Sequence, residues 1–207
     1  IEVGPEKSEK DQIVTPYKFH WEKTNSNEDF IVTRPGINQT NMVLTGTIDF
    51  EDPLQSVFDM NFFADVMNGF CGRLFDTIRE KNHLVYSTSF NFHIFNGGTV
   101  QYWLYAALDA ENIEKARNLM LQELTRPVTD DEAEFVKNKW IGGHQLVLDG
   151  KSSLASIAIN SIVRGYDYNE IINNYHERIE KSKQNVNSLM SRANFQNSKL
   201  VAIIPEK

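Results

Sequence analysis

The sequence is poor in residues that form disulfides or bind metals. Only one of its 207 residues is cysteine, Cys71, and five are histidines. A single cysteine forms neither an intramolecular disulfide nor a cysteine-based zinc cluster, so we expect Cys71 to be a small core residue. The histidines are His20, His83, His93, His144 and His176, and none belongs to a His-x-x-Glu-His motif in either direction. We therefore expect no zinc site and no other cofactor in this chain alone.

Other features that would define a function class are also missing. Gly97 and Gly98 lie in a predicted hairpin without a following helix, so they do not form a phosphate loop, and no Gly-x-Ser-x-Gly elbow is present. The net charge of −7 argues against nucleic acid as a partner. No apolar run approaches the roughly 20 residues that span a bilayer, and the start IEVGPEKSEKDQ is too polar for a signal peptide. A soluble protein without a membrane span is expected, and its compartment is not indicated.

The composition predicts one folded domain preceded by a polar segment. Hydrophobic residues make up 41% and charged residues 24% of the chain, which are ordinary values for a globular protein. Residues 1–28 lack hydrophobic periodicity and contain two prolines, so they are interpreted as a linker or an extended arm. Residues 29–207 are interpreted as a single domain. Because residue 1 is Ile rather than Met, the chain is consistent with a processed or truncated piece of a longer protein.

Hydrophobic periodicity predicts strands and helices that mix without strict alternation. Strands are expected over residues 29–36, 40–50, 84–94, 99–110 and 198–205, with residues 96–98 forming a hairpin turn between the third and fourth. Helices are expected over residues 53–67, 71–78, 111–124, 129–148, 153–164, 168–180 and 184–194. This order favours an α+β fold with an antiparallel sheet and helices packed on one of its faces.

Arg79 and Tyr86 are the residues most able to carry chemistry. Arg79 lies near the end of the predicted helix 71–78, and Tyr86 lies seven residues later, at the start of a strand. Arg79 can be a solvated charge or a helix cap, and Tyr86 can be a core tyrosine beside Phe90 and Phe92. Alternatively, a helix end followed by a strand start brings a guanidinium and a phenol to one edge of the sheet. There, both donors could hold a peptide carbonyl or a developing oxyanion.

The block GRLFDTIREKNHLVYSTSF resembles the Arg/Tyr block of the pitrilysin/insulinase family of zinc metallopeptidases, which is roughly R-L-F-x-x-I-R-E-K-x-x-L-x-Y-S. The matching residues are Arg73, Leu74, Phe75, Ile78, Arg79, Glu80, Lys81, Leu84, Tyr86 and Ser87. The resemblance extends to the strand after Asn38-Gln39 and to the runs FVKNKWIGG, SLASIAINSIVRGY and LVAIIPE, but not to residues 1–28.

The resemblance implies a fold and a divided active site. In this family one domain holds the zinc, and a second domain supplies the Arg and the Tyr, the two closing around the substrate like a clamshell. Tyr86 is then expected to bind the scissile carbonyl as it becomes tetrahedral, and Arg79 to hold a backbone carbonyl of the peptide. The zinc and the water-activating Glu are expected from a partner domain, in the same polypeptide or in a separate subunit.

Three functions remain open at the level of sequence. The resemblance favours a metal-free, C-terminal-type domain of a zinc metallopeptidase, which binds unstructured peptides and is not active alone. A second possibility is a non-catalytic assembly or scaffold subunit that kept the fold, although such a subunit has no use for the Arg and Tyr pair. A third is a stand-alone protein that binds peptides at an exposed sheet edge.

Overall fold

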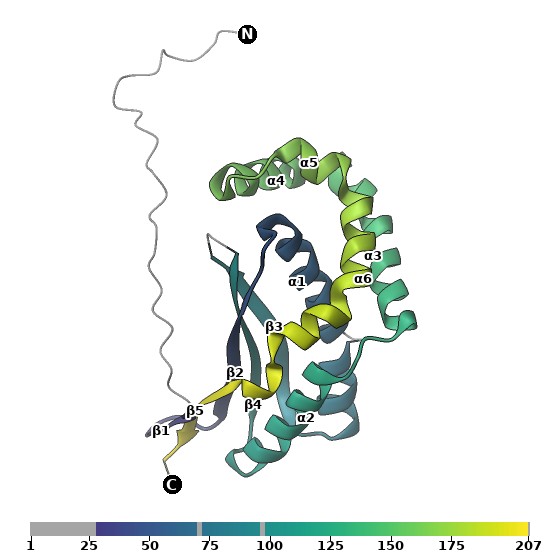
Figure 1. Cartoon of the computed structure of the whole chain (residues 1–207). Helices are drawn as coiled ribbons and strands as arrows, with labels where there is room; N and C mark the ends of the chain where they lie inside the picture. Colours follow the sequence, from purple (N-terminus) through teal and green to yellow (C-terminus); the bar gives the residue numbers. More distant parts are fainter. Residues whose placement is uncertain (1–27, 70–71, 96–97, 207) are drawn as a thin grey trace, which may run out of the picture.

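The computed structural model describes residues 28–69, 72–95 and 98–206, and a mixed sheet with helices on one side makes up this part of the chain (Figure 1). The strands are β1 (Phe30–Arg34), β2 (Thr40–Asp49), β3 (Val85–Ile94), β4 (Thr99–Leu108) and β5 (Lys199–Pro205). The helices are α1 (Pro53–Met67), α2 (Ile113–Thr125), α3 (Asp130–Asp149), α4 (Lys151–Arg164), α5 (Tyr168–Asn173) and α6 (Tyr175–Ala193). A π-helix (Phe75–Lys81) precedes β3, and two 3₁₀ turns (Ala110–Asn112 and Phe195–Asn197) flank the helical half.

The sheet has the strand order β1-β5-β2-β4-β3. The predicted hairpin is confirmed, since β3 and β4 pair antiparallel, and β4 in turn pairs antiparallel with β2. The C-terminal strand β5 inserts between β1 and β2, antiparallel to β2 and parallel to β1. The sheet is therefore mostly rather than entirely antiparallel, and β1 and β3 are its two edges.

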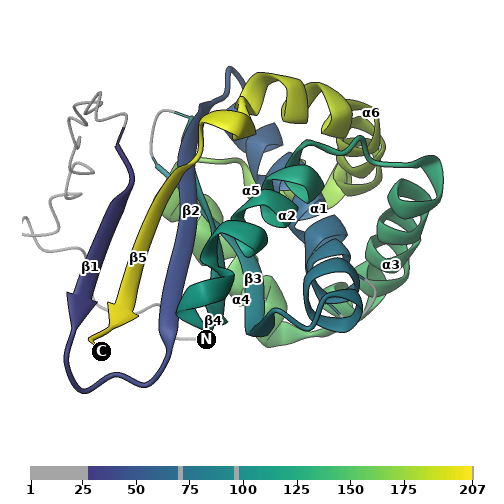
Figure 2. The same ribbon diagram turned by 90° about the horizontal axis from the view of Figure 1, so that it is seen from below.

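The hydrophobic core lies between one face of the sheet and the helices (Figure 2). Leu44 pairs with Leu104 on one side and with Leu200 on the other, and all three side chains are fully buried. Phe62 and Phe63 of α1 are also fully buried and belong to the same core cluster. The alternation of buried and exposed residues along β2 and β4 follows from the two-residue period of a strand with one covered face.

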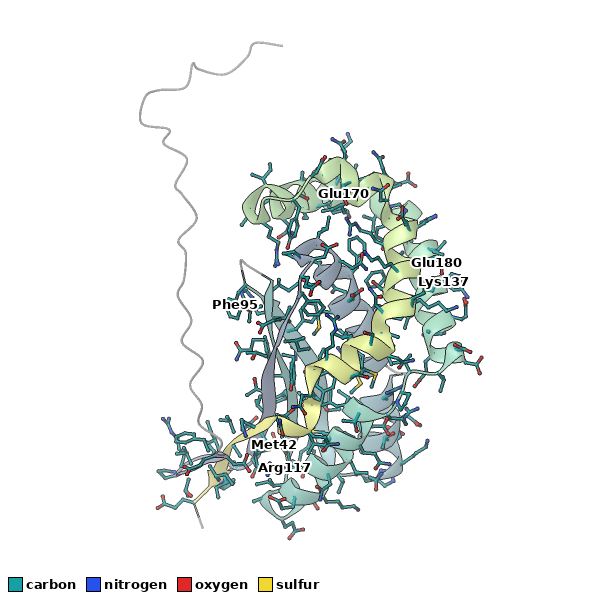
Figure 3. The ribbon with its side chains drawn as sticks, in the orientation of Figure 1. Met42, Phe95, Arg117, Lys137, Glu170 and Glu180 are labelled. Atoms are coloured by element: carbon teal, nitrogen blue, oxygen red, sulfur yellow. The ribbon has the colours of Figure 1, made fainter. Side chains whose placement is uncertain are left out.

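Ion pairs join helices that are distant in sequence. Lys137 of α3 lies 2.6 Å from Glu180 of α6, and the two labelled side chains meet between these helices (Figure 3). Arg117 of α2 reaches Asp29, just before β1, with an N–O distance of 2.6 Å. Ion pairs at the protein surface contribute little free energy each, typically about 0.2 to 1 kcal/mol, and these two pairs are partly exposed. The apolar core therefore accounts for more of the stability than these pairs do.

Several predicted helices are confirmed together with their caps. Asp52 caps α1, which has Pro53 at its first position, and Thr129 with Glu132 forms the predicted capping box of α3. Helix α4 ends at Gly165, in the left-handed conformation with φ of 73°. On this helix three apolar side chains remain more than half exposed, namely Ile159, Ile162 and Val163.

The predicted helix boundaries were wrong at two places. The predicted helix 71–78 is a π-helix displaced toward its C-terminus, ending at Lys81. The predicted helices 168–180 and 184–194 are a short α5 and a long α6, with the break at Asn174. The segment 181–183, Lys-Ser-Lys, contains no helix breaker, so the buried stripe of α6 runs through it without interruption.

Some predictions lie outside the described residues. These are the interpretation of residues 1–27 as an arm, the placement of Cys71 in the core, and the hairpin turn at residues 96–97. In the part of the chain that is described, no individual helix has the length and hydropathy of a membrane span. Helices α3 and α4 pass that test only as a pair bent by 100°.

Candidate functional site

Backbone hydrogen bonds close the turn between the π-helix that carries Arg79 and the strand β3 that carries Tyr86. The His83 N–H donates to the carbonyl of Arg79 at 3.0 Å, and the Leu84 N–H donates to that of Ile78 at 3.2 Å. His83 adopts a left-handed conformation with φ of 51°, which reverses the chain within the turn. The Asn82 side chain also donates to the carbonyl of Thr77 at 2.8 Å. The end of the helix and the start of the strand are therefore held in one fixed relation.

Tyr86 lies at a β-bulge and its side chain is exposed. Val85 pairs with Leu108 and Ser87 pairs with Ala107, so Tyr86 is the extra residue of β3. Simple alternation with Phe90 places Tyr86 on the buried face, but the bulge breaks this alternation and leaves the side chain 61% exposed. The interpretation of Tyr86 as a core tyrosine is therefore wrong. Among the described residues, its hydroxyl makes only long contacts, 3.4 and 3.5 Å, to the carboxylate of Asp109.

Arg79 lies two residues before the C-terminal end of the π-helix and is exposed. Its guanidinium carbon lies 5.3 Å from the centroid of the Phe75 ring, a cation–π distance. The nearby carboxylate of Asp76 is paired with Lys81 at 2.6 Å. Among the described residues Arg79 has no ion pair and its guanidinium caps no helix carbonyl. It is thus a positioned cation that is free to meet a ligand.

A cavity of about 230 Å³ lies beside Arg79. It is lined by Asn68, Gly69, Leu74, Phe75, Arg79 and Thr88. Tyr86 is not among these residues, so Arg79 and Tyr86 flank the same turn without both lining this cavity. The hydroxyl of Thr88 is buried and has no hydrogen-bond partner within the described structure. Such a group is expensive to leave unpaired, and it belongs to a residue that lines the cavity.

Asn68 fixes the outer edge of β3 next to this cavity. Its carboxamide donates to the carbonyl of Phe90 and accepts from the N–H of Phe90, both at 2.7 Å. The side chain thus takes the place of a neighbouring strand at one residue of the edge. Because both polar atoms of the Asn68 side chain are hydrogen-bonded, Asn68 contributes to the cavity wall but not to ligand binding. The side-chain donors left for a ligand among the described lining residues belong to Arg79 and Thr88.

Arg73, in the same sequence block as Arg79, is buried and fully engaged in hydrogen bonds within the fold. Only 3% of it is exposed, and it donates to both carboxylate oxygens of Glu132, at 2.8 and 2.6 Å. It also donates to the carbonyls of Glu123, Arg126 and Pro127. Although burial alone would raise the pKa of Glu132, hydrogen bonds from Arg73 and Thr129 and the charges of Arg73 and Arg126 lower that pKa to about 2. This pair joins the π-helix region to the start of α3.

Sequence reasoning identified Arg79 and Tyr86 but not Thr88, Asn68 or Asp109. Asn68-Gly69 is a recognisable helix-end signal, yet nothing in it indicates a contact with Phe90. Thr88 looks like an ordinary strand residue, because its missing partner is a property of its three-dimensional surroundings. In residues 28–69, 72–95 and 98–206, no group of three or more His, Cys, Asp or Glu side chains is placed to hold a metal ion.

Comparison with known proteins identifies a family and a fold. A family model described as "Peptidase M16 inactive domain" matches residues 5–141, more than half of the chain. None of the curated protein sequences that were compared is a match. Similar solved structures include the periplasmic protease PqqL from Escherichia coli, with a TM-score of 0.70 and 16% identity. A protease from Helicobacter pylori also has a TM-score of 0.70 and 16% identity, and a peptidase M16 inactive domain from Pseudomonas fluorescens has 0.62 and 19%.

The chain spans less than half of these similar structures. The similarity covers 87% of this chain but 21% of PqqL, 86% of this chain but 44% of the H. pylori protein, and 87% of this chain but 44% of the P. fluorescens protein. At these identities the similarity concerns the fold. The predicted α+β architecture is thereby confirmed, and so is the resemblance to this peptidase family. The expectation that the resemblance excludes residues 1–28 was wrong, because the family model matches from residue 5 onward.

Proposed function

Since this chain belongs to the peptidase M16 inactive domain family, we propose that it is the metal-free, substrate-binding half of a zinc metallopeptidase. It binds an extended peptide and supplies donors to a cleavage site whose zinc is carried by a partner domain. Tyr86 donates to the scissile carbonyl as negative charge develops on its oxygen, and Arg79 holds a neighbouring part of the peptide. The peptide, the partner and the zinc are all part of this proposal.

The exposure of Tyr86 is the observation that carries the proposal. An aromatic strand residue normally gains free energy by burying its ring, about 1.5 to 3 kcal/mol for a large side chain. Here a bulge turns the ring outward, and the hydroxyl has only weak contacts with Asp109. Bulges are frequent beside active sites, where they redirect a side chain. A phenol held in this way is available to a ligand without prior rearrangement.

Two further features support the proposal. The preceding helix is a π-helix, a rare conformation that is common at functional sites. Backbone hydrogen bonds within residues 78–84 fix the turn between the π-helix that carries Arg79 and the strand that carries Tyr86, and Arg79 has no ion pair among the described residues. Hydrogen-bond donors that are fixed before the reaction stabilise a transition state more than mobile ones do.

The proposal is tested by replacing Tyr86 with Phe in the assembly that contains this chain and a zinc-bearing partner domain. Removing one oxyanion donor typically costs roughly 2.7 to 4 kcal/mol, so kcat/KM for a quenched fluorescent peptide should fall about a hundredfold or more. The fold should persist, because the exposed hydroxyl contributes little to stability.

Tyr105→Phe is the matched control, since it removes another strand hydroxyl, one that donates to Asn41 at 2.6 Å. Its turnover should stay near the wild-type value. If Tyr86→Phe turned over peptide as fast as the wild type, Tyr86 would have no role as a donor. The chain would then be better described as a scaffold subunit that kept the fold.

A further inference from the structure

Among the described residues that line the cavity beside Arg79, one side chain is charged, and its charge is positive. Its described lining contains no aspartate or glutamate, and the only ionisable side chain is that of Arg79. Asp76, the acidic residue one turn earlier on the same helix, is already paired with Lys81. An arginine guanidinium offers a planar set of donors that matches a carboxylate better than it matches a single carbonyl oxygen. The charge of this cavity thus suits an anion.

Thr88, on another element that lines the same cavity, adds a second donor. The hydroxyl lies on β3, whereas Arg79 lies on the π-helix, so the two groups approach the cavity from different elements. Because the hydroxyl has no partner in the described structure, a ligand oxygen in the cavity would satisfy it. Leu74 and Phe75 provide apolar walls for the aliphatic part of a ligand.

The size of the cavity fits one short side chain. Its volume of about 230 Å³ corresponds to several water molecules, each of which occupies roughly 30 Å³ in the liquid. We propose that this cavity is a specificity pocket for a carboxylate of the bound peptide, held by Arg79 and Thr88. The carboxylate comes from an Asp or Glu side chain or from the C-terminus of the peptide. This inference rests on the proposed function, because it names the kind of peptide that the same site prefers.

Because the chain has a negative net charge, a preference for carboxylate-bearing peptides would indicate a specific binding site. With a net charge of −7, the surface as a whole repels acidic peptides. A peptide that gains affinity from an added carboxylate must therefore find a local cation that outweighs this repulsion. Nonspecific attraction between charges would favour basic peptides instead.

The test measures the binding of nine-residue, acetylated and amidated peptides to the full chain by calorimetry, with one Glu placed at each position in turn. Each peptide is compared with a Gln peptide of the same length, and a second series carries a free C-terminal carboxylate instead of the amide. At one position, or in the free-acid series, the carboxylate should tighten binding about tenfold, as expected for a hydrogen bond to a charged group. The series that shows the gain identifies the source of the carboxylate.

Four variants decide whether this gain belongs to the cavity. Arg79→Gln should abolish the preference, and Thr88→Val should weaken it several-fold while leaving the melting temperature unchanged or higher, because an unpaired hydroxyl is removed. Arg192→Gln is the matched control for charge, since Arg192 is also exposed and lies 5.3 Å from the ring of Phe50. Thr40→Val is the matched control for the hydroxyl, because the Thr40 hydroxyl is likewise buried without a partner. Both controls should keep the preference.

Equal binding of the Glu and Gln peptides, together with equal binding of the free acid and the amide, would contradict the proposal that this cavity binds a carboxylate. The same holds if Arg79→Gln kept the full preference. In either case the proposed function stands if Tyr86→Phe still lowers turnover. A chain to which no peptide binds would contradict both proposals.

Discussion

Arg73 and Arg79 belong to one motif but have opposite environments. Arg73 is buried and donates to a carboxylate and three carbonyls, whereas Arg79 is exposed and has no ion pair among the described residues. A motif read from sequence does not distinguish these roles, because both positions carry the same side chain. The distinction depends on Glu132, which lies far along the chain and reaches Arg73 only in the folded state.

Replacing Glu132 with Gln should destabilise the protein substantially. Arg73 would keep its charge in a buried position without a carboxylate, and breaking a buried pair typically costs about 3 kcal/mol or more. The pKa of Glu132 is lowered in the folded state to about 2, from 4.5, so the carboxylate stabilises the fold above about pH 4.5. As the pH falls toward 2, this contribution is lost, and the difference between wild type and variant should shrink. Urea denaturation of both proteins at several pH values measures this difference in the free energy of unfolding.

Glu134→Gln is the control for this variant. Glu134 lies on the same helix and pairs with Lys137 and Lys183 at the surface, so its loss should have a small effect at every pH. If the two variants were equally stable, the interaction of Glu132 with Arg73 would not be a structural anchor.

At the scale of secondary-structure elements, the edge strand β3 contains a bulge and a pair of side-chain hydrogen bonds that position residues of the site. The bulge at Tyr86 and the clamp of Asn68 on Phe90 lie at different points of the same strand. Between them lies Thr88, which lines the cavity. The periodicity of residues 84–94 predicted the strand correctly, but it did not reveal the bulge, because an extra residue is inserted only where the partner strand allows it.

Asn68→Ala should loosen this edge. The change leaves the N–H and the carbonyl of Phe90 without their partner, which should cost about 1 to 2 kcal/mol because the site is only partly buried. Hydrogen exchange measured by NMR should show faster exchange of the Phe90 amide. Urea denaturation should show the loss of stability.

Asn61→Ala serves as the comparison, because the Asn61 side chain donates only within α1, to the carbonyl of Val57. It should leave exchange at Phe90 unchanged. Unaltered exchange at Phe90 in Asn68→Ala would mean that another group protects this edge.

At the scale of the whole molecule, the chain matches only part of the similar structures named above. It covers 44% or less of the similar structures named above, and its described residues contain no group suited to hold a metal. The helices cover one face of the sheet (Figure 1). The turn at residues 82–84 leads from the π-helix that carries Arg79 into the edge strand β3 that carries Tyr86. An edge position is accessible to a second domain, as the proposed division of the active site requires.

Metal removal should affect the assembly and this chain differently. A chelator should abolish peptide cleavage by the assembly, and added zinc should restore it, because the proposed zinc belongs to the partner domain. The melting temperature of this chain alone should not change with chelator or zinc. Metal analysis of the purified chain should find far less than one zinc per molecule.

A stoichiometric zinc in the isolated chain, or a melting temperature that depends on it, would contradict this division. Cleavage by the assembly that is insensitive to chelation would contradict the proposed mechanism as well.

The amino-acid sequence by itself determined the local and periodic features of this protein. The strand patterns, the capping box at Thr129 and the helix end at Gly165 depend on residues close together in the chain, and they were predicted correctly. The motif around Arg79 and Tyr86 was also sufficient to indicate the family. Only the tertiary structure decided the insertion of β5 between β1 and β2, the bulge that exposes Tyr86, and the cavity shared by Arg79 and Thr88. Each of these depends on partners brought together by the burial of one common core, and such long-range contacts leave no mark on the local pattern.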